Sequence, residues 1–345
     1  AGLAAALQAE LADRPIRAAV VAAPMDAERR FGKVMAMLGS GVRAVLDIAD
    51  GVFIGSATTA PRIGFLFPDD VGDGDPVTAA VAGLRVLDAL GIEGVVAAGH
   101  GLGEFTALHW AGGMDEITLL RIAAARRRIM DAASDGDGMM ASIGAEPELV
   151  EPMLAGENVV IAGYNSPQQT VVSGRVSAVE LVCAKAIECG LTAVKINMPH
   201  ALHSEHMAMA AEQLRAHLDR EHFTPLARRM VSTVTADTLP ADIDVPSLLA
   251  RQVLAPVRFT EAVERLASDV DLILEVGPGA TLCRLAADIA PFAPAISLDA
   301  DSTSLSGLLA AVGAAYALGA PVRHEALFTD RGTRPTADDI HKRAA

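Results

Sequence analysis

The sequence predicts an α/β fold, in which a large parallel-sheet domain carries a small inserted subdomain and follows an N-terminal αβ unit. The length of 345 residues fits one large domain with a satellite, or two domains. Short apolar strands alternate with helical segments, which is typical of a parallel sheet with right-handed crossovers. Residues 138–198 instead read β-α-β-β-α-β, which is the ferredoxin-like pattern.

Composition excludes several function classes. Hydrophobic residues make up 51% of the chain and charged residues 21%, which excludes a disordered chain. The net charge of −15 and the aromatic content of 3% argue against nucleic acid as a partner. The same negative charge argues against binding to an anionic membrane surface.

The start of the chain and its cysteines predict a cytoplasmic location. The first residues lack the charged-then-apolar pattern of a signal peptide. Cys183, Cys189 and Cys283 are odd in number and lack zinc-site spacing, as expected in a reducing compartment. The most apolar stretch, 307–322, is interrupted by glycine and proline and is too short to span a bilayer, so it predicts a buried helix.

The first sixty residues predict a separate αβαβ unit. It ends at the Ser-Ala-Thr-Thr-Ala-Pro linker of residues 56–61. The expected elements are a helix at 2–11, a strand at 16–22, a helix at 26–38 and a strand at 42–48.

The large domain is expected to be built from residues 61–137 and 199–330. An acidic, glycine-rich loop covers residues 69–75, and the helix that follows it leads into a strand that ends just before Gly99. The expected strands are 62–67, 94–98 and 271–276, and the expected helices are 77–90, 104–111, 115–134 and 203–221.

The small subdomain is expected at residues 138–198. An Asn-Ser-Pro turn at residues 165–167 joins its two central strands. Its expected strands are 139–143, 158–162, 170–173 and 192–197, and its expected helices are 147–154 and 177–189.

The most informative motif is Gly99-His100-Gly101-Leu102-Gly103-Glu104. It follows an apolar strand and precedes a helix, which is the setting of a nucleophile elbow in α/β-hydrolase-like folds. The helix start supplies N–H donors for a developing oxyanion. The apex residue, however, is Gly101, which has no nucleophile. Taken alone, the glycine spacing also fits a phosphate-cradling turn, which is a weak signal.

Three histidines follow the small subdomain, at intervals of three. His200, His203 and His206 would diverge on a helix, and no paired carboxylate or cysteine is near, so no metal site is predicted. A structural role is the default for each, and a general base is the sharper hypothesis.

The run Arg126-Arg127-Arg128 lies within the predicted helix 115–134. Arg128 shares a face with Arg121 and Asp131, which indicates a solvated charge. Arg126 and Arg127 both lie near apolar positions, so helical phase does not decide which of them meets a buried anion.

Together these motifs resemble the malonyl-type acyltransferase family of fatty-acid and polyketide synthesis. The similar stretches run in order from about residue 62 to about residue 300. They are RIGFLFP at 62–68, GHGLGEFTAL at 99–108, RRRIM at 126–130, GMMASIGA at 138–145, YNSPQQTVVSG at 164–174, PHALHS at 199–204, QVLAPVRFTEAV at 252–263 and LEVGPGATL at 274–282. The leading unit, 1–60, resembles a ketosynthase-to-acyltransferase linker, and ALHWAGGMDE at 107–116 looks most like the iterative enediyne synthases.

The resemblance implies roles for individual residues. The family's nucleophilic serine falls on Gly101, its general base on His203 and its carboxylate-binding arginine on Arg126. The main-chain group that orients the histidine falls on Gln252, and one oxyanion donor is the N–H of Leu102. Further substrate-binding positions are His100, His200 and Asn165.

The resemblance also implies a two-step reaction. A serine takes malonyl from malonyl-CoA, and the phosphopantetheine thiol of an acyl carrier protein then takes it from the serine. No permanently bound cofactor or metal is expected, and the expected partners are a carrier protein and an adjacent ketosynthase domain. The His-Ala-Leu-His motif at 200–203 resembles the malonyl-selective form of the family. In that form, a bulky residue before the general base excludes substrates with a methyl branch.

Two departures from the family affect activity. Gly101 removes the acyl-serine, so the chain is expected to be inactive as given. Three explanations fit the glycine at position 101. It is an engineered exchange, it marks a naturally non-catalytic module that binds malonyl-CoA or carrier protein, or it is a modified serine that reads as glycine. The intact remainder of the site favours the first and third. The family's Pro-Gly-Gln-Gly turn is also replaced after Pro68 by Asp69-Asp70, which puts its oxyanion-stabilising glutamine in doubt.

Overall fold

The computed structural model describes residues 14–56, 59–69, 75–133, 136–198, 200–300 and 302–328. The helix expected at 2–11 and most of the loop expected at 69–75 lie outside these residues. The chain divides into two compact units. The first comprises residues 1–61, 82–93 and 304–345, and the second comprises 62–81 and 94–303. Helix α3 (Pro76–Ala89) contributes residues to both.

The first unit is built on a three-stranded antiparallel sheet in the order β1-β3-β2. Its elements are β1 (Ile16–Val20), α2 (Ala27–Gly39), β2 (Val45–Asp47), β3 (Val52–Ser56), α12 (Ser306–Leu318) and the 3-10 turn η3 (His324–Phe328). The central strand β3 was not predicted, and Ser56, which was expected to open a linker, ends it. The run Val52–Phe53–Ile54 is almost fully buried, and this is why the strand lies in the middle of the sheet.

Helix α12 packs on β1 and β3, so the prediction that residues up to 330 belong to the large domain is wrong for this helix. The reason is close packing at Gly55, where a Cβ atom would lie 2.1 Å from the main-chain oxygen of Ala317. A glycine in the strand thus admits the helix backbone.

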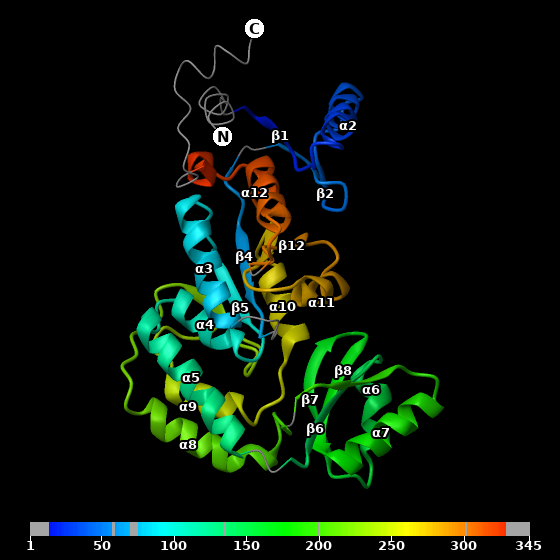
Figure 1. The fold of residues 1–345 in the computed structure, drawn as a ribbon, viewed down its shortest axis with the longest axis vertical. Helices are drawn as coiled ribbons and strands as arrows, with labels where there is room; N and C mark the ends of the chain where they lie inside the picture. The colour runs from blue at the N-terminus through cyan, green and yellow to red at the C-terminus, as the bar shows by residue number, and fades with distance from the viewer. Residues whose placement is uncertain are drawn as a thin grey trace. The chain divides into compact units, whose positions relative to one another are not determined.

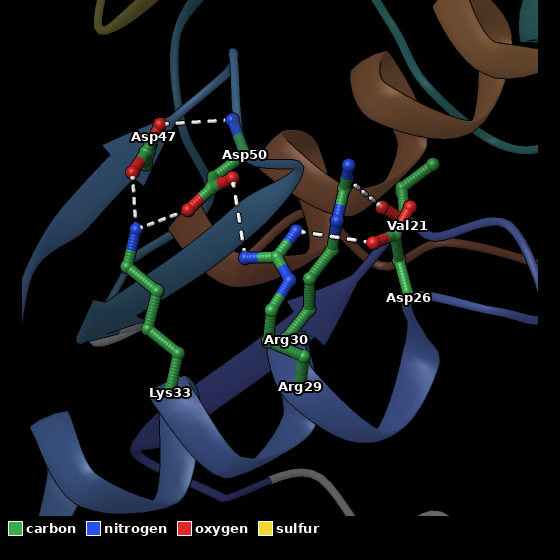
Figure 2. A network of polar contacts seen from close by, with 7 residues as sticks. All are labelled: Val21, Asp26, Arg29, Arg30, Lys33, Asp47 and Asp50. Atoms are coloured by element: carbon green, nitrogen blue, oxygen red, sulfur yellow. Dashed lines mark hydrogen bonds and ion pairs between the residues drawn. The ribbon is translucent and has the colours of Figure 1, made fainter.

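A polar network fastens α2 to the turn between β2 and β3. Lys33 of α2 donates to Asp47 and Asp50, and Arg30 donates to the main-chain oxygen of Val21 at 2.8 Å (Figure 2). The carboxylates hold the pKa of Lys33 above its ordinary value through hydrogen bonds and charge. These contacts orient the helix over the sheet.

The second unit contains the predicted parallel sheet, in the order β10-β5-β4-β11-β12 with every pair parallel. The strands are β4 (Ile63–Phe67), β5 (Val96–Gly99), β10 (Arg229–Val231), β11 (Leu272–Glu275) and β12 (Ala295–Ser297). The helices are α4 (Gly103–Trp110), α5 (Glu116–Ala133), α8 (Ala208–Leu218), α9 (Val245–Gln252), α10 (Phe259–Ala267) and α11 (Thr281–Ile289). Apolar side chains of β4, β5 and β11 pack against α10 and α11 to form the core.

The predicted β-α-β-β-α-β subdomain is also present, as an antiparallel sheet in the order β7-β8-β6-β9. Its elements are β6 (Gly138–Ile143), α6 (Pro147–Val150), η1 (Glu151–Leu154), β7 (Val159–Ser166), β8 (Gln169–Arg175), α7 (Val176–Glu188) and β9 (Ala193–Ile196). Helices α6 and α7 lie on one side of this sheet (Figure 1). Main-chain hydrogen bonds of 2.8 and 2.9 Å link Tyr164 and Ala162 of β7 to Val257, which ties the subdomain to the large sheet.

Candidate active site

The predicted elbow joins β5 to α4 at the carboxyl end of the parallel sheet. Gly101 at its apex has a left-handed backbone with φ +51°, and the N–H of Gly103 donates to the carbonyl of His100 at 2.7 Å. A Cβ atom at Gly103 would lie 1.9 Å from the carbonyl oxygen of Phe67, so this position requires glycine. The sharp strand-turn-helix expected from the motif is therefore present, with Leu102 at the helix N-terminus.

Gln252 holds the elbow by its side chain. Its Nε2 donates a hydrogen bond of 2.7 Å to the carbonyl oxygen of Gly101, and the residue is almost fully buried. The prediction that the main chain of Gln252 orients the histidine is wrong. That carbonyl belongs to Ala255, three residues later, because α9 ends at Gln252 and the chain then turns toward His203.

We expect Gln252→Ala to lower the free energy of unfolding by about 1–2 kcal/mol, because the buried carbonyl of Gly101 loses its 2.7 Å donor and keeps only the longer bond from the N–H of Glu104. Urea unfolding measures this loss. Gln168→Ala is the matched control, since Gln168 is exposed beside the small sheet and its side chain can be removed at little cost. Equal midpoints for the two variants would contradict the bond to Gly101.

His203 is buried and fixed by main-chain contacts on both sides. Its Nδ1 lies 2.8 Å from the carbonyl oxygen of Ala255, and its N–H donates to the carbonyl of Val253 at 2.9 Å. A carbonyl only accepts, so Nδ1 carries the proton and Nε2 is left as the basic nitrogen of the neutral ring. Burial lowers the pKa of His203 to about 4, with the charge of Arg126 acting in the same direction.

The structure differs from the helix predicted at 203–221. His203 has φ +59°, which no helix accommodates, and α8 begins only at Ala208, after the 3-10 turn η2 (Glu205–Met207). The three histidines consequently separate. His200 is buried with its Nε2 3.6 Å from Asp131, and His206 is exposed. Within the described part of the chain, no group of three metal-ligating side chains occurs.

Arg126 is the arginine of the run that turns inward. Its guanidinium lies 5.5 Å from the centre of the Phe105 ring, whereas Arg127 pairs on the surface with Asp75 at 3.0 Å. The Nε atom of Arg126 is buried and finds no acceptor among the described residues. Burial lowers the pKa of Arg126, and Asp69 opposes that shift. A buried guanidinium with an unused N–H donor is suited to bind an anion.

His100 links the elbow to the small subdomain. Its Nδ1 lies 3.1 Å from Oδ1 of Asp69, and its Nε2 lies 3.0 Å from Oδ1 of Asn165 on β7. Asn165 in turn donates to Gln169 of β8 at 3.0 Å. The predicted positions His100 and Asn165 are thus brought together. Asp69 was not predicted as a site residue, although it stands in the turn where the family that the sequence resembles has its oxyanion-stabilising glutamine.

A cavity of about 310 Å³ lies between the carboxyl end of the parallel sheet and the small sheet. Residues from both sides of it line the walls, among them Asp69, His100, Asn165, Leu202 and His203. The cavity is lined by two imidazoles, one carboxylate and several apolar side chains, and the charge of Arg126 reaches Asp69 and His203. A few polar groups among apolar walls are the usual composition of a small-molecule site.

Two buried carboxyl groups were also missed by sequence reasoning. Glu104 accepts hydrogen bonds from the hydroxyls of Ser232 and Thr233, and Glu275 accepts from the N–H groups of Leu282 and Cys283. Glu275 ends the buried strand β11, so a polar residue at the end of an apolar run was the available signal for it, whereas Glu104 lies in the first turn of α4.

A family model described as acyl transferase domain matches residues 77–295, which is more than half of the chain. The chain belongs to this acyl transferase family. The predicted family resemblance and the α/β fold are confirmed.

Individual relatives agree with this assignment. The malonyl CoA-acyl carrier protein transacylase of Bacillus subtilis strain 168 is 33% identical over 218 residues, covering 61% of this chain and 69% of that protein. Polyketide synthase GfsA of Streptomyces halstedii is 33% identical over 270 residues, covering 75% of this chain. The match spans only 4% of GfsA, so this chain corresponds to a small part of that synthase.

A solved acyltransferase domain of the iterative polyketide synthase in enediyne biosynthesis is 36% identical, with a TM-score of 0.88. The match covers 95% of this chain and 90% of that domain. In the described part of the chain, no helix has the length and apolar character that a bilayer crossing requires.

Proposed function

We propose that the chain is the acyltransferase domain of a polyketide synthase, of the iterative type that makes enediyne cores, and that its site takes the malonyl group of malonyl-CoA. The observation that carries the proposal is His203. Its ring is neutral, buried and held through Nδ1, so that Nε2 is available as a base in a cavity beside the elbow. The high similarity to the enediyne acyltransferase domain supports the subtype.

Each role follows from the chemistry of a residue. With a hydroxyl nucleophile at the elbow, Nε2 of His203 would take its proton as it attacks the thioester carbon. The N–H of Leu102 at the start of α4 would donate to the oxyanion. Arg126 would hold the free carboxylate of malonyl by charge and hydrogen bonds. Leu202, which lines the cavity beside His203, would leave no space for a methyl branch.

The chain as given has no hydroxyl at this position, so it forms no acyl-enzyme. In a serine-bearing form, the second step would pass malonyl to the phosphopantetheine thiol of an acyl carrier protein, with an adjacent ketosynthase domain as a further partner. His200 is not among the residues that line the cavity, and its Nε2 lies 3.6 Å from Asp131. A non-catalytic role in binding malonyl-CoA or carrier protein is the second candidate function. The lack of a hydroxyl at Gly101 favours it.

Intact-protein mass after incubation with malonyl-CoA tests the proposal. We expect no adduct on this chain and one malonyl adduct on Gly101→Ser/Asp69→Ala, which supplies a hydroxyl and clears the space around it. Acetyl-CoA is the control donor, because it lacks the carboxylate that Arg126 would bind, and it should give little adduct. If the serine-bearing variant gains no malonyl, the binding-only role is the better account.

A further inference from the structure

Asp69 fills the space that a side chain at position 101 would need. A Cβ atom built on Gly101 would lie 1.8 Å from Oδ2 and 2.7 Å from Cγ of Asp69. Both distances are far inside van der Waals contact, which for heavy atoms begins near 3.5 Å. A side chain at the elbow apex therefore requires the Asp69 carboxylate to leave the position that it occupies here.

The carboxylate is held there by its neighbours. Its Oδ1 pairs with Nδ1 of His100 at 3.1 Å. Burial alone would raise the pKa of Asp69, but His100 and the charge of Arg126 lower it below its ordinary value, so the group is anionic at neutral pH. Its side chain is 38% exposed, because it borders the cavity.

The backbone fixes the position of Asp69 as well. The residue follows β4 by two positions, and β4 pairs with β5 so that Phe67 lies opposite Gly99. The N–H of His100 donates to the carbonyl of Phe67 at 2.9 Å. The stretch 67–69 and the elbow thus run beside each other, and a Cβ atom on Gly101 would lie 3.2 Å from the Cβ atom of Asp69, a close contact that rotation of the carboxylate does not relieve.

We propose that Asp69 and Gly101 form a matched pair, in which the Asp69 carboxylate occupies the nucleophile position and serves as the internal anion of the site. This inference rests on the proposed function. It implies that serine at position 101 alone does not restore acyl transfer. The serine must displace the carboxylate from His100, and the displaced anion then competes with the malonyl carboxylate for Arg126.

A comparison of two serine-bearing variants tests the pair. The variants are Gly101→Ser and the double variant Gly101→Ser/Asp69→Ala, with Asp69→Ala alone as the control that has no hydroxyl, and the measured quantity is the rate of malonyl adduct formation from malonyl-CoA. In that step Oγ of the serine bonds to the thioester carbon, the C–S bond breaks, and the serine proton passes through His203 to the departing coenzyme A thiolate. We expect Gly101→Ser to react at least about tenfold more slowly than the double variant. Equal rates would overturn the matched pair while supporting the proposed function.

The isosteric variant Gly101→Ser/Asp69→Asn separates space from charge. Because asparagine has the size of aspartate, this variant should react nearly as slowly as Gly101→Ser. A rate equal to that of the alanine double variant would overturn the steric part of the proposal.

A stability readout keeps the inference testable if no variant reacts. Gly101→Ser should lower the melting temperature by at least about 3 °C more with Asp69 present than with Asp69→Ala, because only the first pairing crowds the elbow. Failure of every variant to react would then count against the proposed function alone. Additive melting shifts would overturn the matched pair.

Discussion

Replacing Gly99 with alanine is expected to lower the free energy of unfolding by roughly 4 kcal/mol, or to prevent folding. A Cβ atom at Gly99 would lie 2.2 Å from the carbonyl carbon and oxygen of Gly103, and 2.3 Å from the main-chain nitrogen of Glu104. All three are backbone atoms, so no side-chain rotation relieves the overlap. The first turn of α4 would have to move away from β5, which would break the elbow.

Urea unfolding followed by the fluorescence of Trp110 measures this effect. Trp110 is the single tryptophan of the chain, and it is buried at the end of α4. Gly190→Ala is the control. Gly190 has φ +79°, and no neighbouring atom lies within 4 Å of the Cβ atom that alanine would add. This substitution should therefore lower the free energy of unfolding by only about 1 kcal/mol, the cost of a left-handed backbone at alanine. A Gly99→Ala variant as stable as the control would contradict the close approach of α4 to β5.

The sequence predicted the parts of the fold that depend on local residue patterns. Apolar runs with glycine and proline breaks identified the parallel strands β4, β5 and β11 and the β-α-β-β-α-β subdomain, but not the short edge strands β10 and β12. The glycines at 99, 101 and 103 identified the elbow, because that turn depends on the absence of Cβ atoms. Strand β3 was not predicted, because its apolar run is short and the residues after it resemble a linker.

The site was less predictable where tertiary contacts decide the conformation. The apolar spacing of α8 extends back past His203, so a helix was expected there. The carbonyls of Val253 and Ala255 instead hold that residue at φ +59°. Helical phase left two candidates among the arginines, and the packing against Phe105 selects Arg126. The approach of Asp69 to Gly101 depends on the pairing of β4 with β5, which no local pattern contains.

The second large effect concerns Glu104, which lies behind the elbow. Its carboxyl group is fully buried and accepts hydrogen bonds from the hydroxyls of Ser232 and Thr233, the latter at 3.1 Å. Burial raises the pKa of Glu104 to about 7 from its ordinary 4.5, although the two hydroxyls and His100 oppose the shift. The folded state therefore keeps a proton that the unfolded state releases.

The sign of the pH dependence follows from this difference. Below pH 4.5 both states bind the proton, and the shift has no effect on stability. Between pH 4.5 and 7 the folded state binds more protons, so the free energy of unfolding falls as pH rises. Above about pH 7 both states are ionised, and the accumulated loss is about 3 kcal/mol.

Glu104→Gln should remove this loss, because an amide of the same size has no proton to release. We expect the decrease in unfolding free energy between pH 5 and pH 8 to be smaller in the variant by about 2.5 kcal/mol. Urea unfolding at both values measures it. Because the comparison is a difference between two pH values, any fixed cost of exchanging the carboxyl for an amide cancels. Glu205→Gln, at an exposed glutamate, should retain the decrease. If Glu104→Gln also retains the decrease, the Glu104 carboxyl group is already ionised in the folded state, and the hydroxyls of Ser232 and Thr233 fully stabilise its charge.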